Sequence, residues 1–337
     1  MKKFTLIIFV NCVILCHNIL AQDMHFTQFY NSPLYLNPAF TGANVCSRLS
    51  VTYRNQWPGI KTAYRTYMVT GDHYLQKQHV GIGLICGVDQ AGSGDLKTTV
   101  ITPSIAYETR INRAIGLRFG MQPGAVIKSI NFNKLVFGDQ IGRGGNANPS
   151  SVTTLESPTQ NIAFFDLAAG ALIYSQKAWG GISVWHLTQP NESMFSTTEV
   201  RLPIKYSLHG GTKFIISDDK DEMQKKSLSL VGHYRGQKEF DQFDIGLYYT
   251  QYIINIGLWY RGIPVLKAYK PGYSNNDAMA LIIGIQQERF NFGYSYDITI
   301  SKLIGLTRGA HELTMSYQFC NPKKKKVNRV LISCPKF

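Results

Sequence analysis

The sequence predicts an all-β protein, a transmembrane outer-membrane β-barrel of about 14 antiparallel strands. Three observations predict it: short runs of strictly alternating residues, an export signal, and a high content of aromatic residues. The clearest run, Ala114 to Gln122, reads A-I-G-L-R-F-G-M-Q. A period of two residues is that of a strand, so the apolar side chains share one face and Gly, Arg and Gln share the other.

The alternation predicts one side facing lipid and one side facing a lumen. Runs of the same kind lie at 80–84, 254–258, 290–296 and 313–319. In an outer-membrane barrel, lipid contacts the apolar side and the polar side lines the lumen. A soluble sandwich or lipocalin-like barrel also alternates, but it turns its apolar side inward and rarely needs so many strands. The 19 Tyr and 18 Phe favour the membrane barrel, because aromatic girdles lie at both membrane interfaces.

Residues 1–21 are predicted to be a signal peptide. The chain opens with Met-Lys-Lys, residues 4–10 are apolar, and Ala21 is a small residue at the cut, so the mature chain starts near Gln22. A transmembrane anchor is the alternative, but Asn and His residues interrupt an apolar run that is short for a span. No other run approaches about 20 apolar residues, so insertion into the outer membrane requires a barrel.

The charge of the chain limits its partners. The 337 residues carry a formal net charge of +14, and removing the two lysines of the signal peptide leaves +12. A basic chain can bind nucleic acid, but an exported protein seldom meets any. We therefore expect no nucleic acid, and instead outer-membrane lipids together with acidic partners, lipopolysaccharide or peptidoglycan surfaces.

The mature chain keeps Cys46, Cys86, Cys320 and Cys334, none of them in a C-x-x-C pair. An exported protein can form disulfides, and Cys320 with Cys334 is the pair closest in sequence. Buried or free thiols are the alternative, and Cys86 lies on the apolar face of its strand.

The barrel is predicted to span residues 48–319. Period-two segments place its strands at 48–55, 64–75, 79–88, 98–110, 113–123, 164–175, 179–188, 204–216, 227–236, 243–252, 254–262, 278–288, 290–298 and 310–319. Strands 64–75 and 179–188 have an ambiguous register, because Tyr and Trp occupy both faces. An even number of strands is typical of single-chain bacterial barrels.

The connections alternate in length, which predicts how the barrel is oriented. Links near 76–78, 111–112, 176–178, 253 and 289 are tight, whereas 124–163, 189–203, 263–277 and 299–309 are long. One link on the tight side, 217–226, is long and charged. Outer-membrane barrels have short periplasmic turns and long external loops, so we expect both termini in the periplasm.

Residues 22–47 form a separate segment before the first strand. Two prolines prevent regular strand pairing there, and its Phe and Tyr side chains favour burial. The segment either enters the barrel mouth as a plug or serves as a periplasmic docking peptide, and we favour the plug. The residues expected to act in this way are Asp23, His25, Phe26, Gln28, Phe29, Pro33, Leu36, Asn37, Pro38, Phe40 and Gly42.

These residues, with Leu34 and Ala39, closely resemble the opening of the PorP/SprF family, outer-membrane components of the Bacteroidetes type IX secretion and gliding machinery. Residues 53–57 (YRNQW) and 333–337 (SCPKF) also look like family features. The resemblance implies a non-enzymatic protein that assists secretion or surface attachment of a cargo such as an adhesin. It also implies docking to secretion components, periplasmic lipoproteins and peptidoglycan-linked proteins.

Residues 320–337 are predicted to be a basic periplasmic tail. Its cations are Lys323, Lys324, Lys325, Lys326 and Arg329. The tail could be a solvated flank, and the residues alone favour neither that interpretation nor binding of an acidic partner. The family resemblance favours partner docking.

Other functions have weaker support in the sequence. Its His residues are dispersed, without metal-ligand spacing, and no cofactor motif is followed by the helix it would need, so we expect no cofactor and no metal. A barrel-embedded enzyme is a remote alternative. A porin-like solute channel is the main alternative, but Gly, Ser, Thr and Tyr dominate the inward face with few acids, which favours a filled or narrow lumen.

Overall fold

The computed structural model describes residues 23–44, 46–60, 64–92, 94–135, 159–195, 198–218, 222–263, 268–270, 273–274, 276–287, 289–301 and 305–319. These residues build a closed antiparallel barrel of fourteen strands, and a separate two-stranded sheet, β12–β13, lies between β11 and β14. Within the described residues, no helix is long and apolar enough to cross a membrane.

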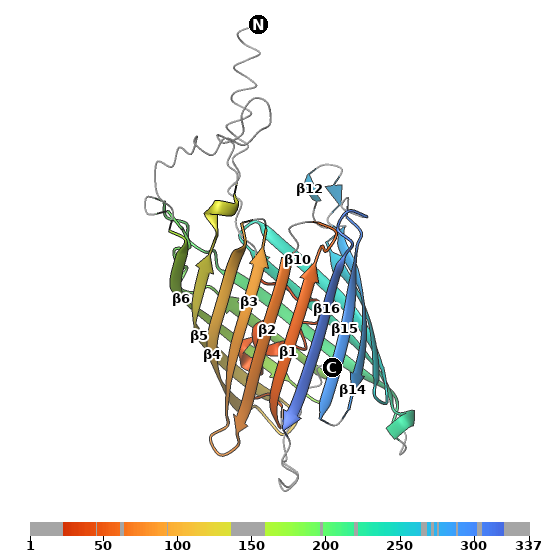
Figure 1. Ribbon diagram of the computed structural model, residues 1–337. Helices are drawn as coiled ribbons and strands as arrows, with labels where there is room; N and C mark the ends of the chain where they lie inside the picture. The colour runs from red at the N-terminus through yellow and green to blue at the C-terminus, as the bar shows by residue number, and fades with distance from the viewer. Residues whose placement is uncertain are drawn as a thin grey trace, which may run out of the picture.

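The barrel strands follow one another around the wall, and the last strand closes on the first (Figure 1). Their bounds are β1 Ser47–Gln56, β2 Tyr64–Leu75, β3 Val80–Ala91, β4 Leu96–Arg110, β5 Gly116–Ser129, β6 Asn161–Tyr174, β7 Ala178–Trp185, β8 Lys205–Ser217, β9 Lys226–Gln237, β10 Phe240–Gln251, β11 Ile254–Gly262, β14 Asn276–Gln286, β15 Phe290–Thr299 and β16 Ala310–Phe319. The small sheet pairs β12 (Ala268–Lys270) with β13 (Tyr273–Ser274). The predicted number of strands is confirmed, and the bounds of β2, β11 and β16 agree with the prediction.

Strand β5 continues six residues beyond the predicted end at 123, to Ser129. Pro123 looks like a strand end because a proline cannot donate to the ladder. In the β4–β5 ladder, pairing stops at Ile101–Ala125 and resumes at Ile105–Met121, and both Pro103 and Pro123 fall in this gap. Each proline still pairs on its other side, with β3 and β6 respectively. Two missing donors thus share one interruption and the wall stays closed.

The outward face is apolar, as the alternation predicts. Ile105, Phe119 and Met121 are each about half exposed, whereas Arg118, Gly120 and Gln122 of the same wall are buried inside. An apolar belt of this kind suits hydrocarbon rather than water. The ambiguous register of β7 is resolved by the interior: Trp179 and Trp185 are both buried on the inward side.

The two ends of the barrel differ. The short β2–β3, β6–β7 and β10–β11 connections lie at one end, the tight-turn end, together with the longer β8–β9 connection. The long β5–β6, β7–β8 and β15–β16 connections lie at the other, the long-loop end, together with the two-residue β9–β10 connection. β1 begins and β16 ends at the tight-turn end, where Ser47 is opposite Phe319. The first described residue, Asp23, instead bonds to His186 and Lys205, next to the long connection between β7 and β8. The chain reaches β1 by crossing the lumen, so Asp23 and Phe319 lie toward opposite ends.

Candidate functional site

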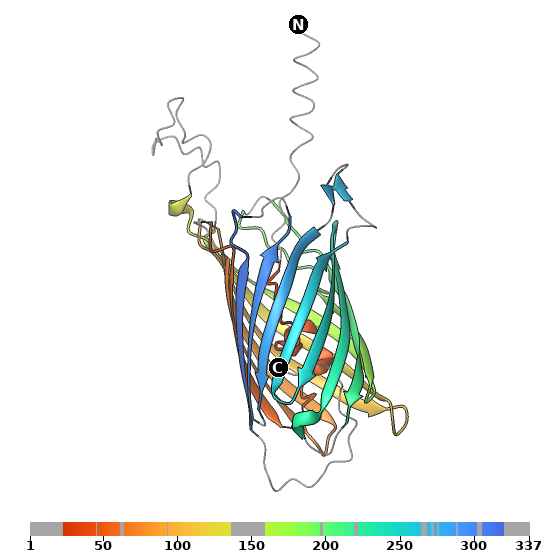
Figure 2. The same cartoon turned by 90° about the vertical axis from the view of Figure 1, so that its right-hand side faces the viewer.

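Residues Asp23–Gly42, the luminal segment, lie inside the barrel (Figure 2). The second half of this segment, its lower part, forms two short helices, α2 (Pro33–Leu36) and η1 (Pro38–Phe40). Each begins at a proline, whose missing N–H is not needed at the start of a helix. Asn37 stands between them, and its side chain accepts a hydrogen bond of 2.8 Å from the Ala39 amide. The prolines that prevent strand pairing therefore build the turns that let the segment fit the lumen.

Inward glycines make space for this segment. A Cβ atom at Gly120 would overlap the backbone of Pro38 and Ala39, and one at Gly170 would overlap the Asn37 side chain. Both glycines lie on neighbouring strands, paired with each other across β5 and β6. The wall is therefore shaped to receive η1 at this position.

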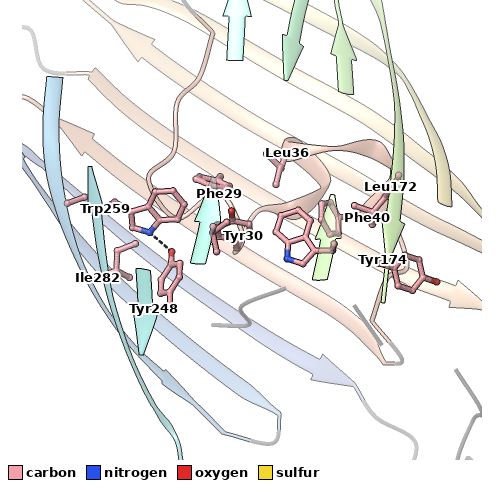
Figure 3. Close-up of a cluster of buried hydrophobic side chains, with 13 residues drawn as sticks. Phe29, Tyr30, Leu36, Phe40, Leu172, Tyr174, Tyr248, Trp259 and Ile282 are labelled. Atoms are coloured by element: carbon pink, nitrogen blue, oxygen red, sulfur yellow. Dashed lines mark hydrogen bonds between the residues drawn. The ribbon is translucent and has the colours of Figure 1, made fainter. Parts of the chain in front are cut away.

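Aromatic side chains of the luminal segment pack against aromatic side chains of the wall (Figure 3). The Phe29 ring lies 5.0 Å from the Trp259 ring, and the Tyr30 and Phe40 rings each lie 5.6 Å from the Trp179 ring. All three pairs meet edge to face, the arrangement that stabilises aromatic contacts beyond the burial of their area. The hydrophobic core of the protein thus lies in the lumen.

A buried ion network joins the segment to β1, β15 and β16. Arg54 bonds Asp297 and Glu312, each at 2.9 Å. The Glu312 carboxylate also accepts the backbone amides of Thr27 and Gln28, at 2.8 and 2.9 Å. Because every charge has an opposite partner and the segment supplies the remaining donors, the burial of these ions is compensated.

The network continues around the wall to β11, β10 and β9. Arg261 bonds Asp297 at 3.2 Å and Asp244 at 3.0 Å, and Arg235 bonds the other Asp244 oxygen at 3.0 Å. Arg235 also donates to Nε2 of His25. Because the Arg235 guanidinium can only donate, Nε2 of His25 accepts this hydrogen bond. His25 is therefore neutral, with its proton on Nδ1. The luminal segment is thereby tied to opposite sides of the barrel.

A second anchor holds the helical part of the segment. Asn37 donates to the carbonyl groups of Ala171 and Ile182, at 3.1 and 2.9 Å. Arg118, paired with Glu108, donates to the Ala39 carbonyl at 2.7 Å. These wall residues come from three adjacent strands, β5, β6 and β7, so they fix the orientation of the helical part against one side of the barrel.

A third anchor, the upper anchor, lies toward the long-loop end. It is Asp23, whose carboxylate bonds Lys205 at 2.6 Å and His186 at 2.8 Å. The other nitrogen of His186 bonds Asp166 at 2.7 Å. Burial lowers the pKa of His186, but the carboxylates of Asp23 and Asp166 outweigh this and raise it to about 9. Burial raises the pKa of Asp23, but Lys205 and His186 outweigh this and hold it well below its ordinary value. Both groups are therefore charged at neutral pH.

Raising the pH should weaken this anchor. The raised pKa means that His186 contributes fully below its ordinary pKa, about 6.5, and that the contribution is lost as the pH rises through about 9. Asp23 behaves in the opposite sense, contributing above its ordinary pKa and losing the contribution in more acidic solution. The difference in unfolding free energy between wild type and His186→Gln should therefore shrink between pH 7 and 10. A difference that stays constant would contradict this ion pair.

A cavity of about 1240 Å³ lies above the luminal segment, on the long-loop side. Its floor includes Asp23, His25 and Tyr35, and its wall is largely apolar. Wall residues include Ile85, Val100, Val126, Phe164 and Leu202.

The eleven residues singled out from the sequence all lie in the luminal segment, but they do not form one cluster. Asp23 forms the upper anchor, Gln28 joins the ion network, Asn37 forms the lower anchor, and Phe26 packs separately with Leu34 and Met68. The basic residues Lys323, Lys324, Lys325, Lys326 and Arg329 and the candidate Cys320–Cys334 disulfide lie outside the described residues.

Sequence reasoning missed the wall residues that hold the segment. The inward face was expected to carry few acids, but Asp72, Glu108, Asp244, Asp297 and Glu312 are all buried there in ion pairs. Single charged residues at inward positions of otherwise apolar strands were the available signal. Their pairing could not be deduced, because it joins strands far apart in sequence.

Comparisons with known proteins give one family model and several solved structures similar to this chain. A family model described as type IX secretion system membrane protein PorP/SprF matches residues 18–317. Among solved structures, the CymD monoaromatic hydrocarbon channel is 9% identical, with a TM-score of 0.45, over 86% of this chain and 93% of that one. A Pseudomonas aeruginosa FadL homologue is 10% identical, with a TM-score of 0.45, over 86% and 94%. The P. putida toluene transporter TodX is 10% identical, with a TM-score of 0.44, over 86% and 94%. No curated protein matches the chain.

Proposed function

The chain belongs to the PorP/SprF family of type IX secretion system membrane proteins, and we propose that it is a plugged, non-enzymatic outer-membrane component of that system. In this role it assists secretion or surface attachment of a cargo such as an adhesin. The long-loop end faces outward and meets the cargo. The tight-turn end and the basic tail face the periplasm and dock lipoprotein or peptidoglycan-linked partners.

One observation supports a holding role over solute transport: the luminal segment is bonded to walls on several sides of the barrel. Glu312 accepts two of its amides, and Asn37 donates to strands β6 and β7. A solute pathway would require these buried bonds to break together, which leaves polar groups unpaired inside the barrel. A barrel closed in this way can present a surface at each end without leaking.

The proposal is tested by conductance and secretion together. Purified wild-type protein in planar bilayers should show no steady conductance, and removal of Asp23–Phe40 should produce one and abolish cargo display on cells. Since this deletion can impair folding, Gly170→Leu provides a second variant, because its side chain would displace Asn37. Gly71→Leu is the matched control, because only atoms at 3.9 Å surround a Cβ there. Steady wild-type conductance, with cargo display unaffected by both plug variants, would identify a solute channel instead.

A further inference from the structure

The cavity above the luminal segment has an apolar wall on the inward side of four neighbouring strands. Ile85, Val100, Val126 and Phe164 line it, one each from β3, β4, β5 and β6. A water-filled barrel turns polar side chains inward, so an inward apolar surface needs another explanation. The volume of about 1240 Å³ is larger than the roughly 300–1,000 Å³ of ordinary small-molecule sites. This wall therefore suits the apolar body of a ligand.

Most charged side chains in the cavity lining are already compensated. They are Asp23, Asp166, His186 and Lys205, which form one network of ion pairs, and Lys128, which bonds Glu192. The network contains two acids and two cations, and the Lys128 pair contains one of each. These groups therefore leave no net charge for a ligand to neutralise.

Asp89, near the end of β3, is different. Its side chain is partly buried and lines the same cavity. One carboxylate oxygen accepts a hydrogen bond of 2.5 Å from the Thr66 hydroxyl on β2, and no cation of the described residues forms an ion pair with Asp89. A carboxylate offers about four lone-pair sites, so Asp89 can accept further donors. Its strongest hydrogen-bond partner is a charged donor such as an ammonium group.

We propose that the cavity binds a cationic amphipathic ligand, whose ammonium group pairs with Asp89 and whose apolar body contacts the wall of Ile85, Val100, Val126 and Phe164. An uncharged ligand would leave the carboxylate without a counter-charge, and an anion would be repelled by it. The ammonium group comes either from a free amine or from a lysine side chain of a polypeptide. The cavity lies above the luminal segment, so binding does not require that segment to move. The inference goes beyond the proposed function, because it needs neither a cargo nor a docking partner.

Isothermal titration calorimetry of the purified protein in detergent tests the preference for a cation. The probes are phenethylammonium and phenethyl alcohol, which share one apolar body and differ in charge, and each is also titrated into detergent without protein. Phenethylammonium should bind wild type about ten-fold more tightly, because a hydrogen bond between charged groups is stronger than one to a hydroxyl. Equal affinities, or no binding of either probe, would overturn the proposal.

Asp89→Asn should remove this ten-fold preference, because the amide keeps the shape of the side chain and loses its charge. Asp95→Asn is the matched control. Asp95 lies at the same end of the barrel, but its side chain is 53% exposed, it pairs with Lys134, and it is absent from the described lining of the cavity. The control should keep the preference for the cation. A preference that survives in Asp89→Asn would assign the cation to another group and overturn the proposal.

A second pair of variants tests the place of the apolar body. Val126→Phe should weaken the binding of both probes several-fold, because the larger side chain fills part of the cavity. Ile127→Phe is the matched control, since Ile127 is the next residue of β5 and is 42% exposed on the outward side. It should leave both affinities unchanged. Equal affinities of the two variants would show that the probes bind elsewhere.

A capped leucyl-lysyl-leucine peptide distinguishes the two sources of the ammonium group. If it binds more tightly than phenethylammonium and loses this affinity in Asp89→Asn, the site takes a lysine side chain of a polypeptide. The reverse order assigns the site to a free amine, and either order supports the cation site. The luminal segment is intact in all of these variants, so bilayer conductance and cargo display test the proposed function separately, whatever the calorimetry shows.

Discussion

Replacing Arg54 by methionine should destabilise the barrel by about 3–5 kcal/mol, because it leaves a buried carboxylate without its cation. Arg54 is 2% exposed and bridges Asp297 and Glu312, and Glu312 in turn holds the Thr27 and Gln28 amides. The luminal segment should therefore lose its attachment to Glu312 at the same time as the barrel loses stability. The unfolding free energy in urea, followed by tryptophan fluorescence in lipid vesicles, measures the first effect, and bilayer conductance measures the second.

Two further variants make this prediction specific. Arg54→Met combined with Glu312→Gln should recover part of the loss, because the unpaired charge is then removed. Arg201→Met is the matched control: Arg201 is largely exposed and pairs with exposed Glu199, so its replacement should change stability by less than about 1 kcal/mol. Equal effects of Arg54→Met and Arg201→Met would mean that the network does not hold the segment.

Replacing Met121 by arginine should cost about 2–4 kcal/mol and impair assembly into the membrane, because a charge on the lipid face near the midplane must leave water. Met121 is 51% exposed on the outward side of β5, opposite the equally exposed Ile105 of β4. The fraction of heat-resistant folded barrel on a gel after insertion into vesicles measures this effect.

Leu306→Arg is the matched control for Met121. Leu306 is 68% exposed, but it lies in the long connection between β15 and β16 rather than on a strand. The same substitution there should leave insertion unchanged, since the connection lies outside the strands. If both variants insert as well as wild type, hydrocarbon does not contact the outward face of β5.

Local patterns were sufficient for much of the barrel wall. The two-residue period predicted the strand number and the outward position of residues such as Phe119, because alternation needs no knowledge of distant contacts. The pattern failed where one residue type is compatible with two different structures. Pro123 looked like the end of a strand and instead lies within β5, facing a ladder gap shared with Pro103.

The ambiguous strands show the same limit. Trp179 and Trp185 of β7 are aromatic residues that sequence analysis could place on either face, since aromatics line both lipid interfaces and cores. Contacts with Phe40 and Tyr35 of the luminal segment place them inside. The interior contains an apolar core only because another part of the chain fills it.

The sequence by itself determined the closed membrane barrel, its lipid-facing side, the family, and the eleven N-terminal residues worth attention. Each of these depends on neighbours along the chain, on repetition or on a continuous motif. Only the tertiary structure decided what holds those residues: the Thr27 amide bonds Glu312, 285 positions away. Which inward charges meet across a lumen depends on how the sheet closes, and closure is a property of all fourteen strands together.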